Sequence, residues 1–267
     1  MATTPEGSEG ILFLSDAHLG GFDETRNRRI EASLIRLIDY CEARRYRICV
    51  LGDLFDYWME YADRGWAPDL GGELLERFRA FNDPARPTLY ITGNHDCWTG
   101  PRLPACGFDV EHRWREQVLG GKKVLLMHGD GLPDPEHPER MERPPLHRLL
   151  RNKNFVKGYQ KILPPGTGTR LMRLFSRLTR SFEGAKHETR VLDGWAERFL
   201  QATDFDLVIC GHDHNPRMRA FDFGTFLNLG TFYRHRSLCL YNKEDFSLVV
   251  WNNADGELRP YRPNIDE

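Results

Sequence analysis

Five short polar motifs hold the residues of this sequence that are best suited to chemistry. In chain order they are DAH at 16–18, GD at 52–53, GNHD at 93–96, HGD at 128–130 and GHDH at 211–214. Their carboxylates, imidazoles and amide oxygen suit Mn²⁺, Fe²⁺ or Zn²⁺. The motifs contain no cysteine, which argues against a structural zinc site. The pattern therefore predicts a metal centre with a catalytic rather than a structural role.

Each motif is weak when it is taken alone. A single histidine after a strand is more often a hydrogen-bonded core residue than a ligand. GNHD is stronger, because Gly93 permits a tight turn and three functional side chains follow at once. All five motifs in one chain, each after an apolar run, are very unlikely to occur by chance.

The elements that must position these motifs are short apolar runs of strand length. Because the carboxyl ends of strands in open α/β sheets meet at one crevice, the five motifs are expected to converge. Helical spacing over residues 28–43 and 73–81 alternates with the strands and predicts an α/β fold. After residue 224 the closely spaced runs predict an antiparallel meander. The runs are Ile11–Leu14, Arg47–Leu51, Thr88–Ile91, Val124–Met127, Leu207–Cys210, Phe226–Leu229, Leu238–Tyr241 and Phe246–Trp251.

Residues 131–190 have a different character, and they predict a helical cap inserted into a single domain that spans residues 1–267. The segment opens with a proline-rich loop, and helical stretches follow at His147–Ile162 and Arg170–Arg180, with no strand. The second stretch is amphipathic and basic, with Arg170, Arg173, Arg177 and Arg180 on one face. Such a helix suits a membrane surface or an anionic lipid. The alternative is a helix that packs by its apolar face and leaves the basic face in solvent.

Composition restricts the remaining possibilities. The net charge is −2, so no global charge favours nucleic acid. The six cysteines form no CxxC pair and are expected to be small buried residues in a reducing compartment. The first residues lack the features of a signal peptide, and no apolar run approaches the ~20 residues that span a bilayer. We therefore expect a cytoplasmic protein.

The motif series DAHLG, GDLFD, GNHD, HGD and GHDH resembles the calcineurin-like metallophosphoesterases. The resemblance implies two packed mixed β-sheets flanked by helices, with a dinuclear metal centre at the strand ends. It also implies that Asp53 bridges the two metals and that His95 faces the substrate. The implied metal ligands are Asp16, His18, Asp53 and His214 for one ion and Asp53, Asn94, His128 and His212 for the other.

This resemblance implies a two-metal hydrolysis of a phosphate ester or anhydride. Two cations about 3.5–4 Å apart can activate a water molecule and hold the phosphoryl oxygens. His95 would protonate the leaving oxygen or stabilise its charge. Asp96 would orient His95 through a hydrogen bond, and a turn-capping role is the alternative. Asp130 and Asp213 are expected to be structural, or to hold the ligands in place, rather than to bind metal themselves.

A narrower resemblance, to the UDP-2,3-diacylglucosamine pyrophosphatases of lipid A synthesis, rests on GDLFDYWMEY, TGNHDCW, HGDGL and the basic insertion. It implies cleavage of UDP-2,3-diacylglucosamine to UMP and 2,3-diacylglucosamine 1-phosphate. Mn²⁺ is the expected metal, with Fe or Zn as the other candidates. The protein would be peripheral on the cytoplasmic face of the inner membrane, without a nucleic acid or an obligate protein partner. The candidate substrate-binding residues are Asn94, Arg148, Arg151, Lys153 and Lys157.

One residue departs from that narrower family. Many of its members have arginine after the asparagine, as GNRD, whereas this chain has His95. Another metallophosphoesterase, such as a nucleotide phosphodiesterase or a phosphatase, is therefore an alternative. A non-catalytic metal-binding scaffold is an alternative from another class, but it predicts missing ligands, and all the matching positions are present.

Overall fold

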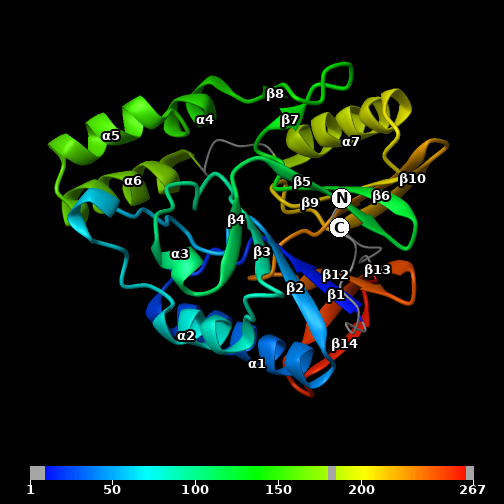
Figure 1. Cartoon of the computed structure of the whole chain (residues 1–267), viewed down its shortest axis with the longest axis horizontal. Coiled ribbons are helices and arrows are strands. Elements are labelled where there is room, and N and C mark those ends of the chain that lie inside the picture. Colours follow the sequence, from blue (N-terminus) through cyan, green and yellow to red (C-terminus); the bar gives the residue numbers. More distant parts are fainter. Residues whose placement is uncertain (1–9, 180–184, 263–267) are drawn as a thin grey trace.

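The computed structural model describes residues 10–179 and 185–262, and in α6 and α7 it does not describe the side chains of residues 175–188. Two mixed β-sheets pack face to face and helices cover their outer faces (Figure 1). The predicted α/β fold with two packed mixed sheets is confirmed. No helix of the described part is long and apolar enough to cross a membrane.

The larger sheet has seven strands in the order β14-β13-β12-β1-β2-β3-β4. Strands β1 to β4 are parallel to one another, whereas β12, β13 and β14 form an antiparallel meander on the other side of β1. The bounds are β1 Gly10–Leu14, β2 Tyr46–Leu51, β3 Thr88–Ile91, β4 Phe108–Glu111, β12 Ser237–Asn242, β13 Asp245–Asn252 and β14 Glu257–Pro260.

The smaller sheet has five strands in the order β10-β11-β9-β6-β5. Strands β6, β9 and β11 are parallel, and β5 and β10 are antiparallel edge strands. The bounds are β5 Trp114–Leu119, β6 Lys122–Met127, β9 Leu207–Cys210, β10 Arg217–Phe221 and β11 Gly224–Asn228. The predicted meander after residue 224 is therefore wrong for its first strand, because β11 pairs in parallel with β9 in the other sheet.

Alternation along the strands explains the layers. In β1, Ile11 and Phe13 face the core between the two sheets, while Leu12 and Leu14 face the helices α1 Glu24–Ala43 and α2 Gly72–Phe81. Both faces of the strand are buried, which accounts for its continuous apolar sequence. On the opposite outer face, α7 Ala185–Ala202 packs Trp195 and Phe199 against the smaller sheet.

Each predicted apolar run forms a strand, but β4, β5, β10 and β14 have no counterpart among them. Their sequences are interrupted by charged residues, as in WREQVL and RMRAF, because these strands are partly exposed at or near sheet edges. Two short helical elements, η1 Ala62–Arg64 and α3 Arg102–Ala105, lie in the connections.

The segment between β6 and β9 begins with a small hairpin, β7 Leu132–Pro133 and β8 Met141–Glu142, where no strand is predicted. The helices α4 Pro145–Leu150, α5 Lys153–Ile162 and α6 Pro165–Thr179 follow and lie together at one side of the molecule (Figure 1). The predicted helix His147–Ile162 is divided, because Asn152 caps α5 by accepting hydrogen bonds from the backbone of residues 154 and 155. Arg180 and the side chain of Arg177, part of the predicted basic face, lie outside the described part.

The helices α4 to α6 contact the sandwich through an apolar cluster. Leu150 and Met172 pack with Tyr57, Met59 and Trp98 of the connections that follow β2 and β3. The Trp98 indole N–H donates a hydrogen bond to the Leu150 carbonyl at 2.6 Å. These contacts place α4 and α5 beside the strand ends that carry GD and GNHD.

Candidate metal centre

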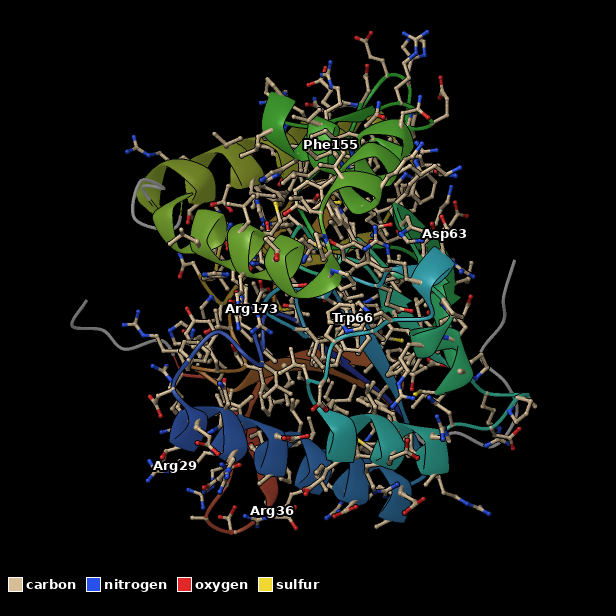
Figure 2. The ribbon with its side chains drawn as sticks, turned by 90° about the vertical axis from the view of Figure 1, so that its left-hand side faces the viewer. Arg29, Arg36, Asp63, Trp66, Phe155 and Arg173 are labelled. Atoms are coloured by element: carbon tan, nitrogen blue, oxygen red, sulfur yellow. The ribbon has the colours of Figure 1, made fainter. Side chains whose placement is uncertain are left out.

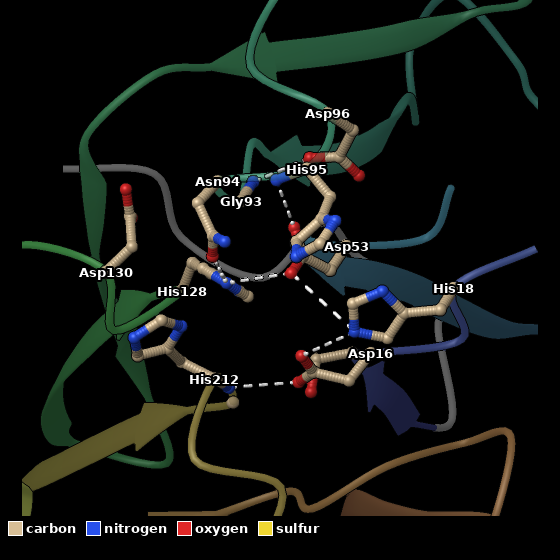
Figure 3. Close-up of polar contacts among 12 residues, drawn as sticks. Asp16, His18, Asp53, Gly93, Asn94, His95, Asp96, His128, Asp130 and His212 are labelled. Atoms are coloured by element: carbon tan, nitrogen blue, oxygen red, sulfur yellow. Dashed lines mark hydrogen bonds and ion pairs between the residues drawn. The ribbon is translucent and has the colours of Figure 1, made fainter. Parts of the chain in front are cut away.

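The five polar motifs come together at the carboxyl ends of β1, β2, β3, β6 and β9 (Figure 3). Five of their residues have left-handed backbone conformations, a region that non-glycine residues rarely adopt. Such residues cluster at functional sites because the surrounding structure must hold them there. The φ values are 51° for Asp16, 46° for His18, 53° for Asp53, 76° for His212 and 60° for His214.

One group of donor atoms comes from Asp16, His18 and His214. Asp16 Oδ1 lies 3.6 Å from His18 Nε2 and 3.2 Å from His214 Nε2, and the two nitrogens are 3.3 Å apart. Asp16 Oδ1 is buried and has no hydrogen-bond partner in the described part of the chain. A carboxylate oxygen and two imidazole nitrogens that face one another in this way fit a divalent cation.

A second group comes from Asp53, Asn94 and His128. His128 Nε2 lies 3.4 Å from Asp53 Oδ2 and 3.1 Å from Asn94 Oδ1. His128 Nδ1 is 2.9 Å from the Leu51 carbonyl oxygen, to which it donates a hydrogen bond. The lone pair of Nε2 is therefore the one that can bind a metal. Asp53 Oδ2 is also 3.7 Å from His18 Nε2, and Asp53 therefore lies between the two groups.

Close packing of the turns brings these groups together. A Cβ atom at Gly93 would lie 2.0 Å from Asp53 Oδ1, so only glycine allows the GNHD turn to approach the GD turn. The backbone N–H of His95 donates to the same Asp53 oxygen at 2.9 Å. The glycine of GNHD thus has a role in packing as well as in the turn.

His212 is attached to the first group through its backbone, since its N–H donates to Asp16 Oδ2 at 3.0 Å (Figure 3). Its ring lies next to the His128 ring, with centroids 5.1 Å apart. Within the described residues, the three compact groups of possible ligands do not include His212. Burial and the neighbouring His128 lower the pKa of His212 to about 3, which keeps its ring neutral.

The electrostatics of the site favour a bound cation. Burial lowers the pKa of His18, but Asp16, Asp56 and Asp53 outweigh burial and raise it to about 10. Burial also lowers the pKa of His128, and Asp53 raises it to about 10. Burial raises the pKa of Asp53, but His128 and His95 hold it far below its usual range. Without a metal, protons on the histidines would balance the buried carboxylates.

The His95 ring faces a carboxylate that sequence reasoning missed. His95 Nδ1 lies 3.2 Å from Asp56 Oδ1, and His18 Nδ1 lies 3.4 Å from the same oxygen. Asp56 is the second aspartate of GDLFD, and that motif is the signal that could have identified it. The two histidine rings are edge to face, with centroids 4.8 Å apart.

Comparison with known proteins gives this geometry a context. The sequence profile of the family described as calcineurin-like phosphoesterase matches residues 10–216. The chain belongs to this family. Calcineurin-like phosphoesterases are metal-dependent hydrolases, and the fold family implies divalent metal ions at the site.

Several curated relatives share one name. A protein of Blochmanniella pennsylvanica named UDP-2,3-diacylglucosamine hydrolase is 27% identical over 212 residues, which cover 77% of this chain and 79% of that protein. One of Vibrio cholerae with the same name is 26% identical over 244 residues, which cover 87% of this chain and 95% of that protein. The structure of an archaeal phosphodiesterase matches with a TM-score of 0.47 at 11% identity, and covers 90% of this chain and 99% of that one.

In this calcineurin-like phosphoesterase, Asp96 lies away from the His95 ring contact and holds the GNHD turn. Its buried carboxylate accepts hydrogen bonds from the backbone N–H groups of Leu54 and Gly93, at 2.9 and 2.7 Å, and from the Tyr90 hydroxyl at 2.5 Å. Burial and the charge of Asp53 raise the pKa of Asp96 to about 6. The contacts match the turn-capping alternative, and Asp56 is the carboxylate beside His95.

Arg151, a predicted phosphate contact, uses its guanidinium group within the protein. Its Nε donates to Asp130 Oδ2 at 2.8 Å, and its terminal nitrogens donate to Thr92 Oγ1 and to the carbonyls of Thr92, Gly93 and His112. These bonds account for all five N–H groups of an arginine. Arg151 therefore ties the start of α5 to the GNHD and HGD turns.

The other cap candidates line two cavities, one of which reaches the metal centre. Lys153 and Lys157 line a cavity of about 510 Å³ that also contacts Cys97, Trp98 and Arg151. Arg148 lines a second cavity of about 550 Å³ that reaches His212 and Asp130. Asn94 differs from these residues, because its side chain contacts His128 within the metal centre itself.

Proposed function

We propose that this calcineurin-like phosphoesterase hydrolyses UDP-2,3-diacylglucosamine to UMP and 2,3-diacylglucosamine 1-phosphate. The observation that carries the proposal is a cavity of about 550 Å³ that reaches His212 and has both apolar and basic walls, with Leu132, Leu192 and Arg148 among them. A second cavity is lined by Val156 and Trp98 together with Lys153 and Lys157. Apolar walls suit acyl chains, and ammonium groups suit phosphate. The shared name of the curated relatives supports this substrate.

Asp16, His18, Asp53 and His214 would hold one metal ion, and Asp53, Asn94, His128 and His212 would hold the other, with Mn²⁺ as the first candidate. Bound divalent cations supply Lewis acidity and neutralise charge on the phosphoryl oxygens. The chain itself supplies rigid ligand positions, since Asp56 and the Leu51 carbonyl face the second ring nitrogens of His18 and His128.

His95 would donate a proton to the leaving oxygen through Nε2. Asp56 beside Nδ1 fixes the orientation of the ring. Because the side chain of His95 is only 11% exposed, bulk water competes poorly for that proton. Asp96 would affect catalysis only indirectly, because it holds the GNHD turn that carries His95.

The proposal extends to the location and organisation of the chain. Exposed apolar side chains on the helices beside the cavity, Ile162 at 79% and Leu174 at 57%, suit peripheral contact with a membrane that contains the lipid substrate. We place the protein on the cytoplasmic face of the inner membrane. We treat residues 131–190 as a cap within a single domain.

Hydrolysis of UDP-2,3-diacylglucosamine by the purified chain, followed as UMP release with Mn²⁺ and with chelator, tests the proposal. Mn²⁺-dependent UMP formation that chelator abolishes is the expected result. His95 in place of arginine favours one second candidate, a phosphodiesterase with a different substrate. Turnover of an aryl phosphodiester without UMP release from the lipid would select that candidate and discard the lipid substrate.

A further inference from the structure

A basic cavity lies on the side of the metal centre formed by the start of α1. Its volume is about 340 Å³, and its walls include Arg26 and Arg29 of α1 together with Phe232, Tyr233 and Arg236 from the segment after β11. Small-molecule sites typically occupy about 300–1,000 Å³, so the volume suits a ligand of modest size. None of these residues belongs to the metal ligands or to the cap.

The charge of this cavity points to an anionic ligand. Three guanidinium groups and one carboxylate, that of Asp23, line the cavity. Asp23 is the N-cap of α1, and its carboxylate accepts a 2.9 Å hydrogen bond from the backbone N–H of Arg26. No ion pair joins Arg26, Arg29 or Arg236 to a carboxylate within the described part of the chain. The adjacent Arg28, by contrast, pairs with Glu24.

Aromatic rings accompany the charge, because Phe232 and Tyr233 line the cavity and Phe22 lies beside Arg26. The guanidinium carbon of Arg26 lies 4.1 Å from the centroid of the Phe22 ring and 5.5 Å from that of Tyr233. Aromatic rings and guanidinium groups are surfaces on which proteins place nucleobases. Guanidinium groups also donate in pairs to phosphate oxygens and to base carbonyls.

Tyr233 connects this cavity to the metal centre. Its ring centroid lies 5.7 Å from that of His18 and 6.0 Å from that of His214. The backbone N–H of the preceding Phe232 donates a hydrogen bond to the Asp16 carbonyl at 3.1 Å. This bond holds the segment that carries Tyr233 against the loop that carries Asp16 and His18. Tyr233 therefore both lines the cavity and lies beside two of the proposed metal ligands.

The cavity and the cap lie on different sides of the centre. Figure 2 shows Arg29 on α1 at one end of the molecule and Phe155 of the cap at the other. A substrate with two unlike halves joined by a pyrophosphate needs a separate place for each half. The cap cavity, with Trp98 and Val156, suits the apolar half.

We propose that the cavity between α1 and Tyr233 binds the nucleotide half of the substrate, a pyrimidine nucleoside monophosphate unit. The base would lie against Tyr233 and Arg26, Arg29 and Arg236 would donate to its carbonyls, and the phosphate would lie at the metal centre. This inference rests on the proposed function for the identity of the nucleotide. It adds the residues that distinguish a nucleotide diphosphate from a simple phosphodiester.

The test is calorimetric titration of Mn²⁺-loaded protein with UMP and, separately, with inorganic phosphate, which needs only the metal centre. The wild type is expected to bind UMP at least about 10-fold more tightly than phosphate, since each charge-assisted hydrogen bond contributes that order of affinity. The double variant Arg29→Gln/Arg236→Gln should lose most of that difference while its phosphate affinity stays within about 2-fold. Arg28→Gln, on the same helix but paired with Glu24, is the matched control and should behave as the wild type.

Two results would overturn the inference: UMP that binds no more tightly than phosphate to the wild type, or a double variant with unchanged UMP affinity. Lipid hydrolysis is measured on the same preparations and separates the two proposals. Loss of UMP preference in the double variant without any lipid turnover in the wild type would keep the nucleotide site and reject the lipid substrate. Lipid turnover by the wild type, with the same UMP affinity in the wild type and the double variant, would keep the lipid substrate and reject the nucleotide site.

Discussion

Asp56 and His95 are joined across two different loops, with Asp56 Oδ1 3.2 Å from His95 Nδ1. The same oxygen is 3.4 Å from Nδ1 of His18, so one carboxylate faces both a proposed metal ligand and the proposed acid. Burial raises the pKa of Asp56, but the His18 and His95 rings hold it far below its usual range. Asp56 therefore remains charged at neutral pH.

Asp56→Asn should lower kcat by about 10²-fold, because the carboxylate that orients the ring of the proposed acid His95 is lost. It should also weaken metal binding by about 10–100-fold through His18. Steady-state kinetics at saturating Mn²⁺ separate the first effect from the second. Asp69→Asn, at an exposed position, is the control. Wild-type kcat in Asp56→Asn at saturating metal would contradict the proposed role.

Asp53→Ala should remove metal, whereas His95→Ala should leave it bound. Asp53 lies between both donor groups, with Oδ2 3.4 Å from His128 and 3.7 Å from His18. His95→Ala should lose about 10²–10⁴-fold in rate, as expected when a general acid is removed. Elemental analysis of the dialysed proteins gives the metal content. Full metal in Asp53→Ala, or loss of metal in His95→Ala, would reverse these assignments.

The sequence predicts the metal centre better than the surroundings of that centre. The proposed ligands lie in short motifs directly after buried strands, so a local pattern is enough to suggest them. Asp56 and Arg151 act through partners distant in sequence, and no local pattern shows those contacts. Arg151 was expected to be available to phosphate, but Asp130 and the loop carbonyls occupy it. The strands β5 and β10 escaped prediction because edge positions tolerate charged residues.

Metal binding near neutral pH should release protons. The pKa of His18 and that of His128 are each about 10 in the metal-free site, so both rings carry a second proton at pH 7.5. A metal ligand must be neutral, and binding therefore displaces up to two protons. Apparent affinity should rise with pH by up to about 100-fold per unit below pH 10. His212 contributes no proton, since its pKa is about 3.

Calorimetric titration with Mn²⁺ in buffers of different ionisation enthalpy measures this release directly. A slope of between one and two protons per protein is expected from the two raised histidines. Binding heats that do not depend on the buffer would show that both histidines are already neutral at pH 7.5.

Arg151→Met should destabilise the protein strongly because it leaves Asp130 buried without its closest cation. Asp130 is 4% exposed in its side chain, and Arg151 Nε lies 2.8 Å from it, whereas Arg143 Nε is 3.7 Å away. Breaking a buried ion pair costs about 3–5 kcal/mol. At about 2–4 °C per kcal/mol for a chain of this size, Tm should fall by about 6–20 °C.

Thermal unfolding of Arg151→Met and Arg151→Lys, with Arg148→Gln as the control, distinguishes this tether from a residue that only faces substrate. Arg148 is exposed, and its replacement should change the free energy of unfolding by less than about 0.5 kcal/mol. Lysine restores the charge near Asp130 but not the fork that reaches both the Thr92 and Gly93 carbonyls. Arg151→Lys should therefore have a Tm between those of Arg151→Met and the wild type. Its metal binding should still be weaker than that of the wild type, because Asn94 directly follows the Thr92 and Gly93 carbonyls that Arg151 holds. Equal Tm for Arg151→Met and Arg148→Gln would mean that α4 and α5 do not depend on this ion pair for their attachment to the metal centre.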